Sequence, residues 1–245
     1  MKRYSIAIFI MFFVFPVYAI SSYKANYDLY AETDFGNINV ATAEYELKVF
    51  NNTYFFTSNS RTINIWSALY DYSIDEISIG LLKDNVPIAD YYKISENDGD
   101  LINNYEIQIY PNEIYVSLNN EALVNGFTKT ELKGLSKPSL EVNAAEIVDA
   151  LSIYLHISND IQKNPNKNLF IYQMVDKKGI TQREFTLKGF ETISINNKEL
   201  ETIKIVCPEF GLTLNVSKDH NFMPVMIKKI NGKTMYKLIL RDFMG

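Results

Sequence analysis

Asp149, Ser152 and His156 are the three residue types of a serine hydrolase triad, and they lie within one short segment. In such a triad the histidine takes the proton of the serine, and the carboxylate orients the histidine. Here all three side chains would project side by side from one helix, whereas a catalytic base usually reaches its nucleophile from another element. The sequence has no serine on a Gly-flanked elbow and no Cys–His pair. We therefore interpret the three residues as a solvated polar stripe on a helix.

Metal ligands are equally sparse, because the chain has two histidines, His156 and His220, and one cysteine. A zinc site needs three or four clustered ligands. His156 and Asp160 have the i, i+4 spacing that places two ligands on one helical face, but no further ligands stand nearby. We expect this pair to lie in water, and Asp219 and His220 to form a turn before a strand. Without a Gly-rich phosphate loop or a dinucleotide fingerprint, we expect no cofactor and no metal.

Cys207 is the remaining nucleophile to consider. Ile203 and Ile205 alternate with Lys204 ahead of it, so we expect a small buried thiol on the dry face of a strand rather than a reactive one. A carboxylate pair for glycoside hydrolysis is left open among the 29 acidic residues, but nothing places one of them in an apolar pocket. We assign no catalytic residue and expect a protein that is not an enzyme.

The N-terminus has the three parts of an export signal. Lys2 and Arg3 precede an apolar stretch over residues 6–17, which is shorter than the roughly 20 residues that span a bilayer. Small residues favour cleavage between Ala19 and Ile20, and no lipid-attachment cysteine follows. The sequence therefore predicts a signal peptide at 1–19, a single domain at 20–245 without stable membrane insertion after cleavage, and a location in the periplasm.

Charge and cysteine content narrow the choice of partners. The chain has 24 basic and 29 acidic residues and a net charge of −5. Without a stripe of Lys and Arg, nucleic acid is not expected as a partner, and an anionic membrane surface is equally unfavourable. One cysteine allows no internal disulfide, so stability must come from the apolar core.

The dominant pattern from residue 22 onward is an alternation of apolar and polar residues, which is typical of half-buried β-strands. Tyr45, Leu47 and Val49 alternate with charged residues in the plainest example. Turns are expected at Asn231-Gly232, at Lys177-Lys178-Gly179 and at Asn196-Asn197, since such residues accept a positive φ. Strands are predicted near 22–31, 53–66, 68–82, 101–109, 112–118, 168–175, 180–188, 198–206, 225–230 and 234–240.

One segment changes its period and predicts a helix over about residues 144–158. Asn143 and Glu146 have the spacing of a capping box, and about two-thirds of the helix surface that follows is apolar. So much apolar surface cannot be covered by one flat neighbour. We therefore predict a mainly β protein, with an antiparallel curved sheet or a partly open β-barrel or sandwich that holds one buried helix.

Four segments carry a resemblance to a known family. They are Tyr23–Tyr27, Pro87–Tyr92, Asp149–Ser152 and Met223–Ile227, and in this order the chain is similar to exported bacterial proteins grouped as domain of unknown function 3108. The resemblance covers nearly all of residues 20–245. It implies a periplasmic protein of a Gram-negative bacterium with a predominantly antiparallel β fold, and it brings no catalytic residue.

Two functions follow as expectations. The first is a binding or carrier module for a hydrophobic, lipid-like ligand, because the helix has more apolar surface than one neighbour can cover. The second is a structural or interaction protein of the cell envelope without a small-molecule ligand, which would show an exposed apolar patch or an uncovered edge strand. The 17 tyrosines either fill the core or line a cleft. The candidate ligand-lining residues are Leu151, Tyr154, Leu155, Tyr91 and Tyr92.

Overall fold

The computed structural model describes residues 19–34, 36–69, 71–99, 101–109, 113–118, 121–128, 147–176, 179–232 and 234–245. The predicted export signal lies outside the described residues except for Ala19, at its end. Asn143 and Glu146 of the predicted capping box also lie outside them.

The described residues form one sheet of fifteen strands in the order β8-β7-β6-β5-β4-β3-β2-β1-β15-β14-β13-β12-β11-β10-β9. It consists of two meanders, β1–β8 and β9–β15, which are joined where β1 pairs with β15. Every pair of neighbours is antiparallel except β9 and β10. Strands β8 and β9 are the two edges, so the sheet is open.

The first meander contains β1 (Tyr23–Thr33), β2 (Gly36–Phe50), β3 (Thr53–Thr62), β4 (Ser73–Lys83), β5 (Val86–Asn97), β6 (Ile102–Ile109), β7 (Glu113–Leu118) and β8 (Glu121–Thr128). The second contains β9 (Ile147–Val148), β10 (Leu169–Asp176), β11 (Gly179–Ile195), β12 (Lys198–Cys207), β13 (Leu212–Ser217), β14 (Met223–Asn231) and β15 (Thr234–Met244). The helices are α1 (Asn64–Leu69), α3 (Ser152–Lys163) and the short 3-10 helices η2 (Pro208–Phe210) and η3 (Lys218–His220).

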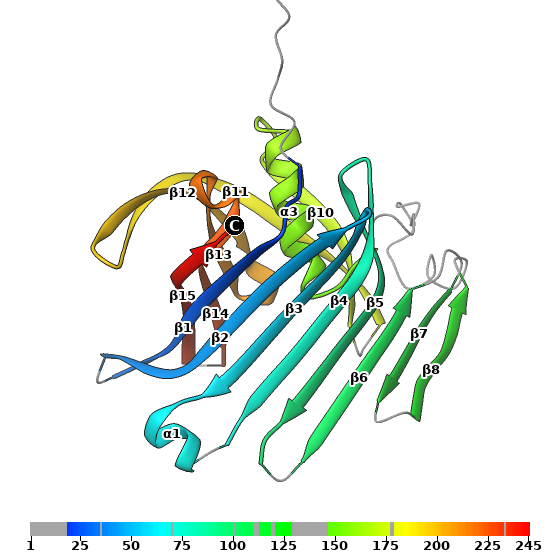
Figure 1. Ribbon diagram of the computed structural model, residues 1–245, viewed down its shortest axis with the longest axis horizontal. Coiled ribbons are helices and arrows are strands. Elements are labelled where there is room, and N and C mark those ends of the chain that lie inside the picture. Colours follow the sequence, from blue (N-terminus) through cyan, green and yellow to red (C-terminus); the bar gives the residue numbers. More distant parts are fainter. Residues whose placement is uncertain are drawn as a thin grey trace, which may run out of the picture.

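The sheet curls so that its two meanders face each other, with α3 held between them (Figure 1). We call β1–β6 the front wall and β10–β15 the rear wall. Of the predicted alternatives, an antiparallel curved sheet or a partly open β-barrel or sandwich, the structure has the curved open sheet. The prediction of one buried helix is confirmed, because eight of the twelve residues of α3 are buried. Figure 1 also shows the β11–β12 hairpin curving away from the rest of the rear wall.

Three of the tight turns consist of two residues with positive φ, as two-residue hairpins require. Asn196-Asn197 is confirmed, with φ of 50° and 61°, and Asn51-Asn52 and Asp84-Asn85 form the same kind of turn. The predicted hairpin after residue 230 is also present, but Asn231 pairs with Thr234, so the turn starts one residue later than expected, at Gly232. Asp176 pairs with Gly179 between β10 and β11, whereas Lys177 and Lys178 of the turn predicted there lie outside the described residues.

The structure corrects the predicted limits of the helices. Helix α3 starts at Ser152 instead of residue 144 and continues to Lys163, beyond the predicted end. Ile147 and Val148 form the short parallel strand β9, because β-branched side chains suit an extended chain beside β10. The predicted strands 53–66 and 68–82 are interrupted by α1, so β3 ends at Thr62 and β4 begins at Ser73.

Helix α3 divides the apolar core into two clusters. Leu151 and Leu155 belong to the cluster against the front wall, which contains Tyr27, Tyr54 and Phe56. Ile153, Ile157 and Ile161, spaced four residues apart on another side of the helix, belong to the cluster against the rear wall. The rear cluster also contains Phe170, Phe185, Ile205, Leu214 and Val216. The helix therefore packs against both clusters, and the cluster against the front wall also contains rear-wall residues such as Val225 and Leu240.

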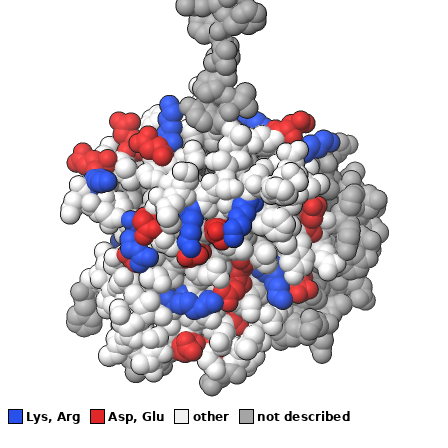
Figure 2. Space-filling model, viewed as in Figure 1, with Lys and Arg blue, Asp and Glu red and all other residues white. Residues whose placement is uncertain are grey.

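The outward face of the front wall is polar and carries side chains of both charges. Ion pairs such as Lys24–Glu44, Arg61–Asp75 and Lys93–Glu106 join neighbouring strands across it. Figure 2 shows basic and acidic side chains next to each other on this side of the molecule, without a large area of one sign. Exposed pairs of this kind add little stability, so the walls depend on their inner faces.

Gly80 provides a test of how closely β4 and β5 approach. A Cβ atom at this position would overlap the carbonyl oxygen of Ile88 and lie 2.8 Å from Cε1 of Tyr54. We expect Gly80→Ala to lower the free energy of unfolding by at least about 2 kcal/mol, measured by urea denaturation. Gly232→Ala is the matched control, because its φ of 61° is strained but no atom lies within 4 Å, and we expect it to lose only about 1 kcal/mol. Equal losses would contradict the predicted steric overlap.

Candidate ligand-binding groove

The first turn of α3 is capped by a buried carboxylate. Oδ1 of Asp149 accepts the backbone N–H groups of Leu151 and Ser152, each at 2.8 Å. The backbone N–H of Asp149 donates in turn to Oγ of Ser152 at 2.9 Å. This reciprocal pair satisfies N–H groups that have no partner within the helix. The capping residues are therefore Asp149 and Ser152, three residues apart as in the predicted box but six residues later.

The same carboxylate fastens the helix to the front wall. Ser78 of β4 donates its hydroxyl to Oδ2 of Asp149 at 2.6 Å, and the Tyr54 hydroxyl lies 3.2 Å from Ser78 Oγ. Because Ser78 gives its proton to Asp149, Tyr54 is the donor to Ser78. Burial raises the pKa of Asp149, although these hydrogen bonds act in the opposite direction. The polar contact thus fixes where the helix begins on the sheet.

Glu76 lies next to this contact on the concave face of β4. Its Oε1 accepts the hydroxyl of Tyr92 at 2.6 Å. Burial raises the pKa of Glu76, and the neighbouring Asp149 raises it further. Tyr92 is itself 5% exposed and belongs to the front cluster. This hydrogen bond gives Tyr92 a structural role, since it satisfies a hydroxyl that would otherwise be buried without a partner.

The predicted solvated stripe on α3 is wrong, because Asp149, Ser152 and His156 are all buried. Each is at most 5% exposed, since this part of the chain lies between the two walls (Figure 1). The hydroxyl oxygen of Ser152 accepts a hydrogen bond from the backbone N–H of Asp149. Nε2 of His156 has no hydrogen-bond partner among the described residues. The three side chains therefore do not form a proton-relay chain.

The other candidate metal ligands and the cysteine also lie apart. Asp160 accepts the hydroxyl of Tyr172 at 2.8 Å instead of pairing with His156. In the described part of the chain, no three His, Cys, Asp or Glu side chains come together in a way that could hold a metal ion. Cys207 is 1% exposed, as expected for a small buried thiol, and Asp219 and His220 form the predicted turn within η3.

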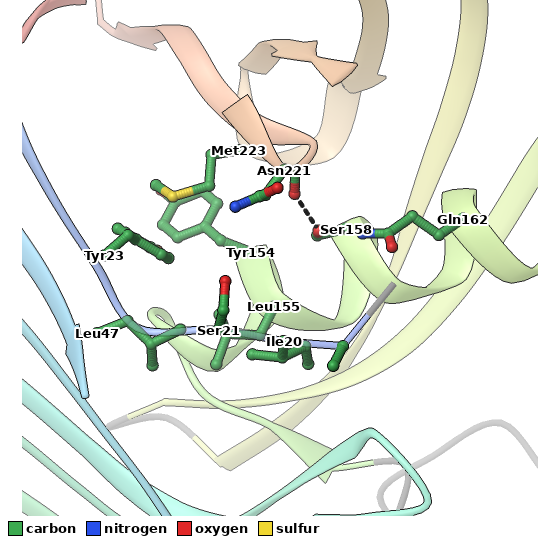
Figure 3. A pocket seen from close by; sticks show the side chains of 11 residues that line it. Ile20, Ser21, Tyr23, Leu47, Tyr154, Leu155, Ser158, Gln162, Asn221 and Met223 are labelled. Carbon is green, nitrogen blue, oxygen red and sulfur yellow. Dashed lines mark hydrogen bonds between the residues drawn. The ribbon is translucent and has the colours of Figure 1, made fainter. Parts of the chain in front are cut away.

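The front side of α3 faces a cavity that protein side chains almost fill (Figure 3). Tyr154 and Leu155 line it together with Ile20, Tyr23 and Met223. Its volume is about 20 Å³, which accommodates one water molecule but no organic ligand. The N-terminal segment closes one side, because Ile20 N–H donates to Oδ1 of Asn85 at 2.8 Å. The apolar surface of the helix is covered here by the protein itself.

A larger groove lies at the C-terminal end of α3, with a volume of about 630 Å³. Its floor is a strip of paired residues in three strands: Phe190 of β11 faces Ile203 of β12, and Ile203 faces Val216 of β13. Val216 is fully buried, whereas Phe190 is 86% exposed. The lining is completed by Ile161, Gln162, Pro165, Asn166, Asn168, Leu187, Glu201, Thr202, Lys218 and Phe222.

A bulge in β11 forms this apolar floor. The register shifts between Leu187 and Gly189, and Gly189 has a φ of 112°, which is readily adopted only by glycine. Residues three apart on a regular strand point to opposite faces. The extra residue of the bulge puts Leu187 and Phe190 on the same face, opposite Ile205 and Ile203. The sequence pattern missed these residues because it assumes unbroken alternation.

The five predicted ligand-lining residues do not converge on this groove. Tyr154 and Leu155 line the small cavity, and Leu151 and Tyr92 are buried in the front cluster. Tyr91 directly precedes Tyr92 on the same strand and therefore points to the outer face. A signal that could have indicated the groove is Gly189-Phe190 in the middle of a long strand, because glycine within a strand often marks a bulge.

The described residues contain no helix with the length and apolar character needed to cross a membrane.

Fold and groove together define a protein with a curled, open antiparallel β-sheet around one helix and an apolar groove at the helix end. A structure with the same fold is a β-barrel-like protein of domain of unknown function DUF1849 from Brucella abortus, with a TM-score of 0.54 and 8% sequence identity. The match covers 92% of this chain and 98% of that one. No family model matches the chain, and no curated protein does. The likeness therefore concerns the fold alone.

His156 gives a testable pH dependence. Burial lowers its pKa from 6.5 to about 4. Between about pH 6.5 and pH 4 the unfolded chain binds a proton that the folded chain does not, so stability must fall as the pH falls. We expect His156→Gln to remove up to about 3 kcal/mol of this loss at pH 4, measured as unfolding free energy against pH. The raised pKa values of Asp149 and Glu76 affect the pH dependence of the wild type and of the variant equally. They therefore cancel when the two unfolding free energies are subtracted.

The control for this measurement is His220→Gln. Burial lowers the pKa of His220 as well, while Asp219 acts against the shift, and the side chain is only half-buried. We expect the control to change the pH dependence less than His156→Gln does. A wild-type curve that keeps its slope in the His156 variant would show that this imidazole titrates normally in the folded protein.

Proposed function

We propose that the protein is a non-enzymatic binding or carrier module for a hydrophobic, lipid-like ligand, which it holds in the groove at the end of α3. The observation that carries this proposal is the groove of about 630 Å³, which lies within the roughly 300–1,000 Å³ typical of small-molecule sites. Seven of its lining residues are apolar: Ile161, Pro165, Leu187, Phe190, Ile203, Val216 and Phe222.

The gradient of exposure across the floor supports an elongated apolar ligand. The inner end at Val216 is closed by the core, and the outer end at Phe190 is almost wholly exposed. A large aromatic side chain on a strand normally gains stability from burial, which Phe190 does not obtain within the described protein. A hydrocarbon chain lying along Phe190 and Ile203 would provide it. The polar side chains of Asn166, Glu201 and Lys218 at the rim leave the other end of the ligand in water.

Binding of a fluorescent fatty acid tests the groove directly. We expect the purified wild-type chain to bind the probe, and Phe190→Ser to weaken its affinity about tenfold, because the variant removes one aromatic ring from the contact. Ile203→Asn should weaken it similarly by placing an amide in the floor. The matched control is Phe50→Ser, which removes another exposed phenylalanine, 71% accessible on β2 and away from the groove. Absence of binding by the folded wild type, or equal loss in the control, would refute the proposal.

The cellular setting is part of the proposal. We infer that residues 1–19 are an export signal, that the chain acts in the periplasm of a Gram-negative bacterium, and that it is a member of the domain of unknown function 3108 family. Support comes from the basic and apolar N-terminus and from the position of Ile20, whose N–H is anchored to Asn85. A chain beginning at Ile20 would keep this hydrogen bond and complete the small cavity beside α3.

N-terminal sequencing of protein from a periplasmic extract tests the export step. We expect the first residue to be Ile20, because Ala19 is the small residue that a signal peptidase accepts. The replacement Ala19→Arg should block cleavage and leave the longer chain in the membrane fraction. Ser21→Arg is the control on the other side of the bond. Recovery of the uncut chain in the cytoplasm would exclude the periplasmic assignment.

One observation favours the alternative of a cell-envelope interaction protein. Phe50, Phe55 and Leu81 are 71%, 41% and 49% exposed. Phe55 and Leu81 point outward from β3 and β4, and Phe50 ends β2 beside them, in register with Thr53. Exposed apolar groups of this kind mark surfaces that meet other proteins. The fatty acid titration separates the two functions, since an interaction protein without a ligand would leave the probe unbound in every variant.

A further inference from the structure

Two basic side chains lie on one aromatic ring at the opposite end of the rear wall from the groove. Cζ of Arg183 in β11 is 4.5 Å from the ring centroid of Phe210, and Nζ of Lys229 in β14 is 3.9 Å from it. Phe210 belongs to η2, the turn between β12 and β13. In a chain with a net charge of −5, two cations on one ring require an explanation.

Strand pairing places both cations on the inner face of the rear wall. Arg183 is opposite Tyr172, and Lys229 is opposite Leu212, which in turn faces Cys207. Tyr172, Leu212 and Cys207 all belong to the rear core cluster. The two cations therefore stand at the edge of an apolar core instead of on the outer surface.

Their charges are compensated incompletely. Arg183 lies 3.7 Å from Glu209, whose side chain is 52% exposed, a distance too long for a strong hydrogen bond. No ion pair to Lys229 occurs within the described parts of the chain. Burial lowers the pKa of Lys229, and the nearby Arg183 lowers it further while Cys207 opposes the shift. An additional anion at this place would stabilise both cations.

Two buried donors beside the cations also have no partner. Nε of Arg183 and Oγ1 of Thr181 are both inaccessible to solvent and form no hydrogen bond among the described residues. Thr181 precedes Arg183 by two positions on β11, so the two side chains project from the same face. A buried donor without an acceptor is costly, more so when it carries a charge. Together the guanidinium, the ammonium and the hydroxyl present donors from β11 and β14.

We propose that Arg183, Lys229 and Thr181 form a binding site for a phosphate group. A planar guanidinium can donate two parallel hydrogen bonds to a phosphate, an ammonium provides a point charge for another oxygen, and the hydroxyl donates to a further one. The group comes from free phosphate or from the head of a phosphate-bearing ligand. The site is separate from the apolar groove, because the packed side chains of Phe185 and Ile205 lie between them in the sheet.

Titration of the purified chain at constant ionic strength tests this site. Inorganic phosphate and glycerol 3-phosphate serve as the two probes, and potassium chloride serves as the control salt. We expect phosphate to raise the melting temperature and to shift the side-chain Nε–H resonance of Arg183. Tighter binding of glycerol 3-phosphate would identify a phosphoester head group as the natural source, and equal or weaker binding would identify free phosphate. An equal response to chloride would overturn the proposal.

Variants assign the effect to the two cations. Lys229→Met keeps an apolar chain over Phe210 and should weaken phosphate binding about tenfold, as should Arg183→Gln. Lys204→Met is the matched control, since Lys204 pairs with Glu191 on the outer part of β12. Glu209→Gln removes the competing carboxylate and should tighten binding several-fold without disturbing the core. Unchanged affinity in both Lys229→Met and Glu209→Gln would overturn the site, whereas Phe190→Ser should leave it unaffected.

Discussion

The hydrogen bond from Ser78 to Asp149 is the contact on which the arrangement of the molecule depends. It connects the front wall to the first turn of α3, which Asp149 also caps through two backbone N–H groups. The helix then contributes Leu151 and Leu155 to one core cluster and Ile153, Ile157 and Ile161 to the other. A helix displaced along its axis would separate Oδ2 of Asp149 from the Ser78 hydroxyl and would shift both rows away from the side chains against which they pack. Polar satisfaction and apolar packing therefore require the same position.

The second constraint is the pairing of the first strand with the last. Strand β1 has β2 on one side and β15 on the other. Both meanders therefore extend outward from the pair formed by the first and the last strand. Because the edges β8 and β9 are not paired with each other, the sheet can curl around α3 without the fixed diameter of a closed barrel. The curvature of the sheet brings the rear wall against α3. It leaves the groove open at the C-terminal end of the helix.

The two proposed sites use opposite ends of the rear wall and different physical properties. At one end, the bulge at Gly189 turns Phe190 toward Ile203 and Val216 and gives an apolar surface. At the other end, Arg183 and Lys229 come together on Phe210 and give a basic site. The packed core between them, with Phe185 at 1% and Ile205 at 0% exposure, keeps a hydrocarbon chain and an anion apart. Each site can therefore be altered without changing the other.

The local pattern of residues was sufficient for most of the strands, but it missed β8, β9, β13 and the turns at Asn51-Asn52 and Asp84-Asn85. Alternation in β2 placed Tyr45 and Leu47 inside and Lys48 outside, and Asn196-Asn197 marked a tight turn, because both features depend on neighbouring residues alone. The apolar surface of the helix predicted its existence. Its predicted start, residue 144, lies eight residues before the observed start at Ser152. Two capping pairs with the same spacing were available, and Ser78, 71 residues earlier in the chain than Asp149, selected the second.

The sequence by itself thus determined a mainly β chain with one buried helix, since the periodicity of apolar residues acts over a few positions. Only the tertiary structure decided that the polar side of α3 is buried, that Tyr91 and Tyr92 lie on opposite faces, and that Phe190 and Ile203 meet in a groove. These outcomes depend on a bulge and on pairings between strands far apart in the chain. The residues around one position do not specify a contact with a distant residue that only the curvature of the sheet brings close.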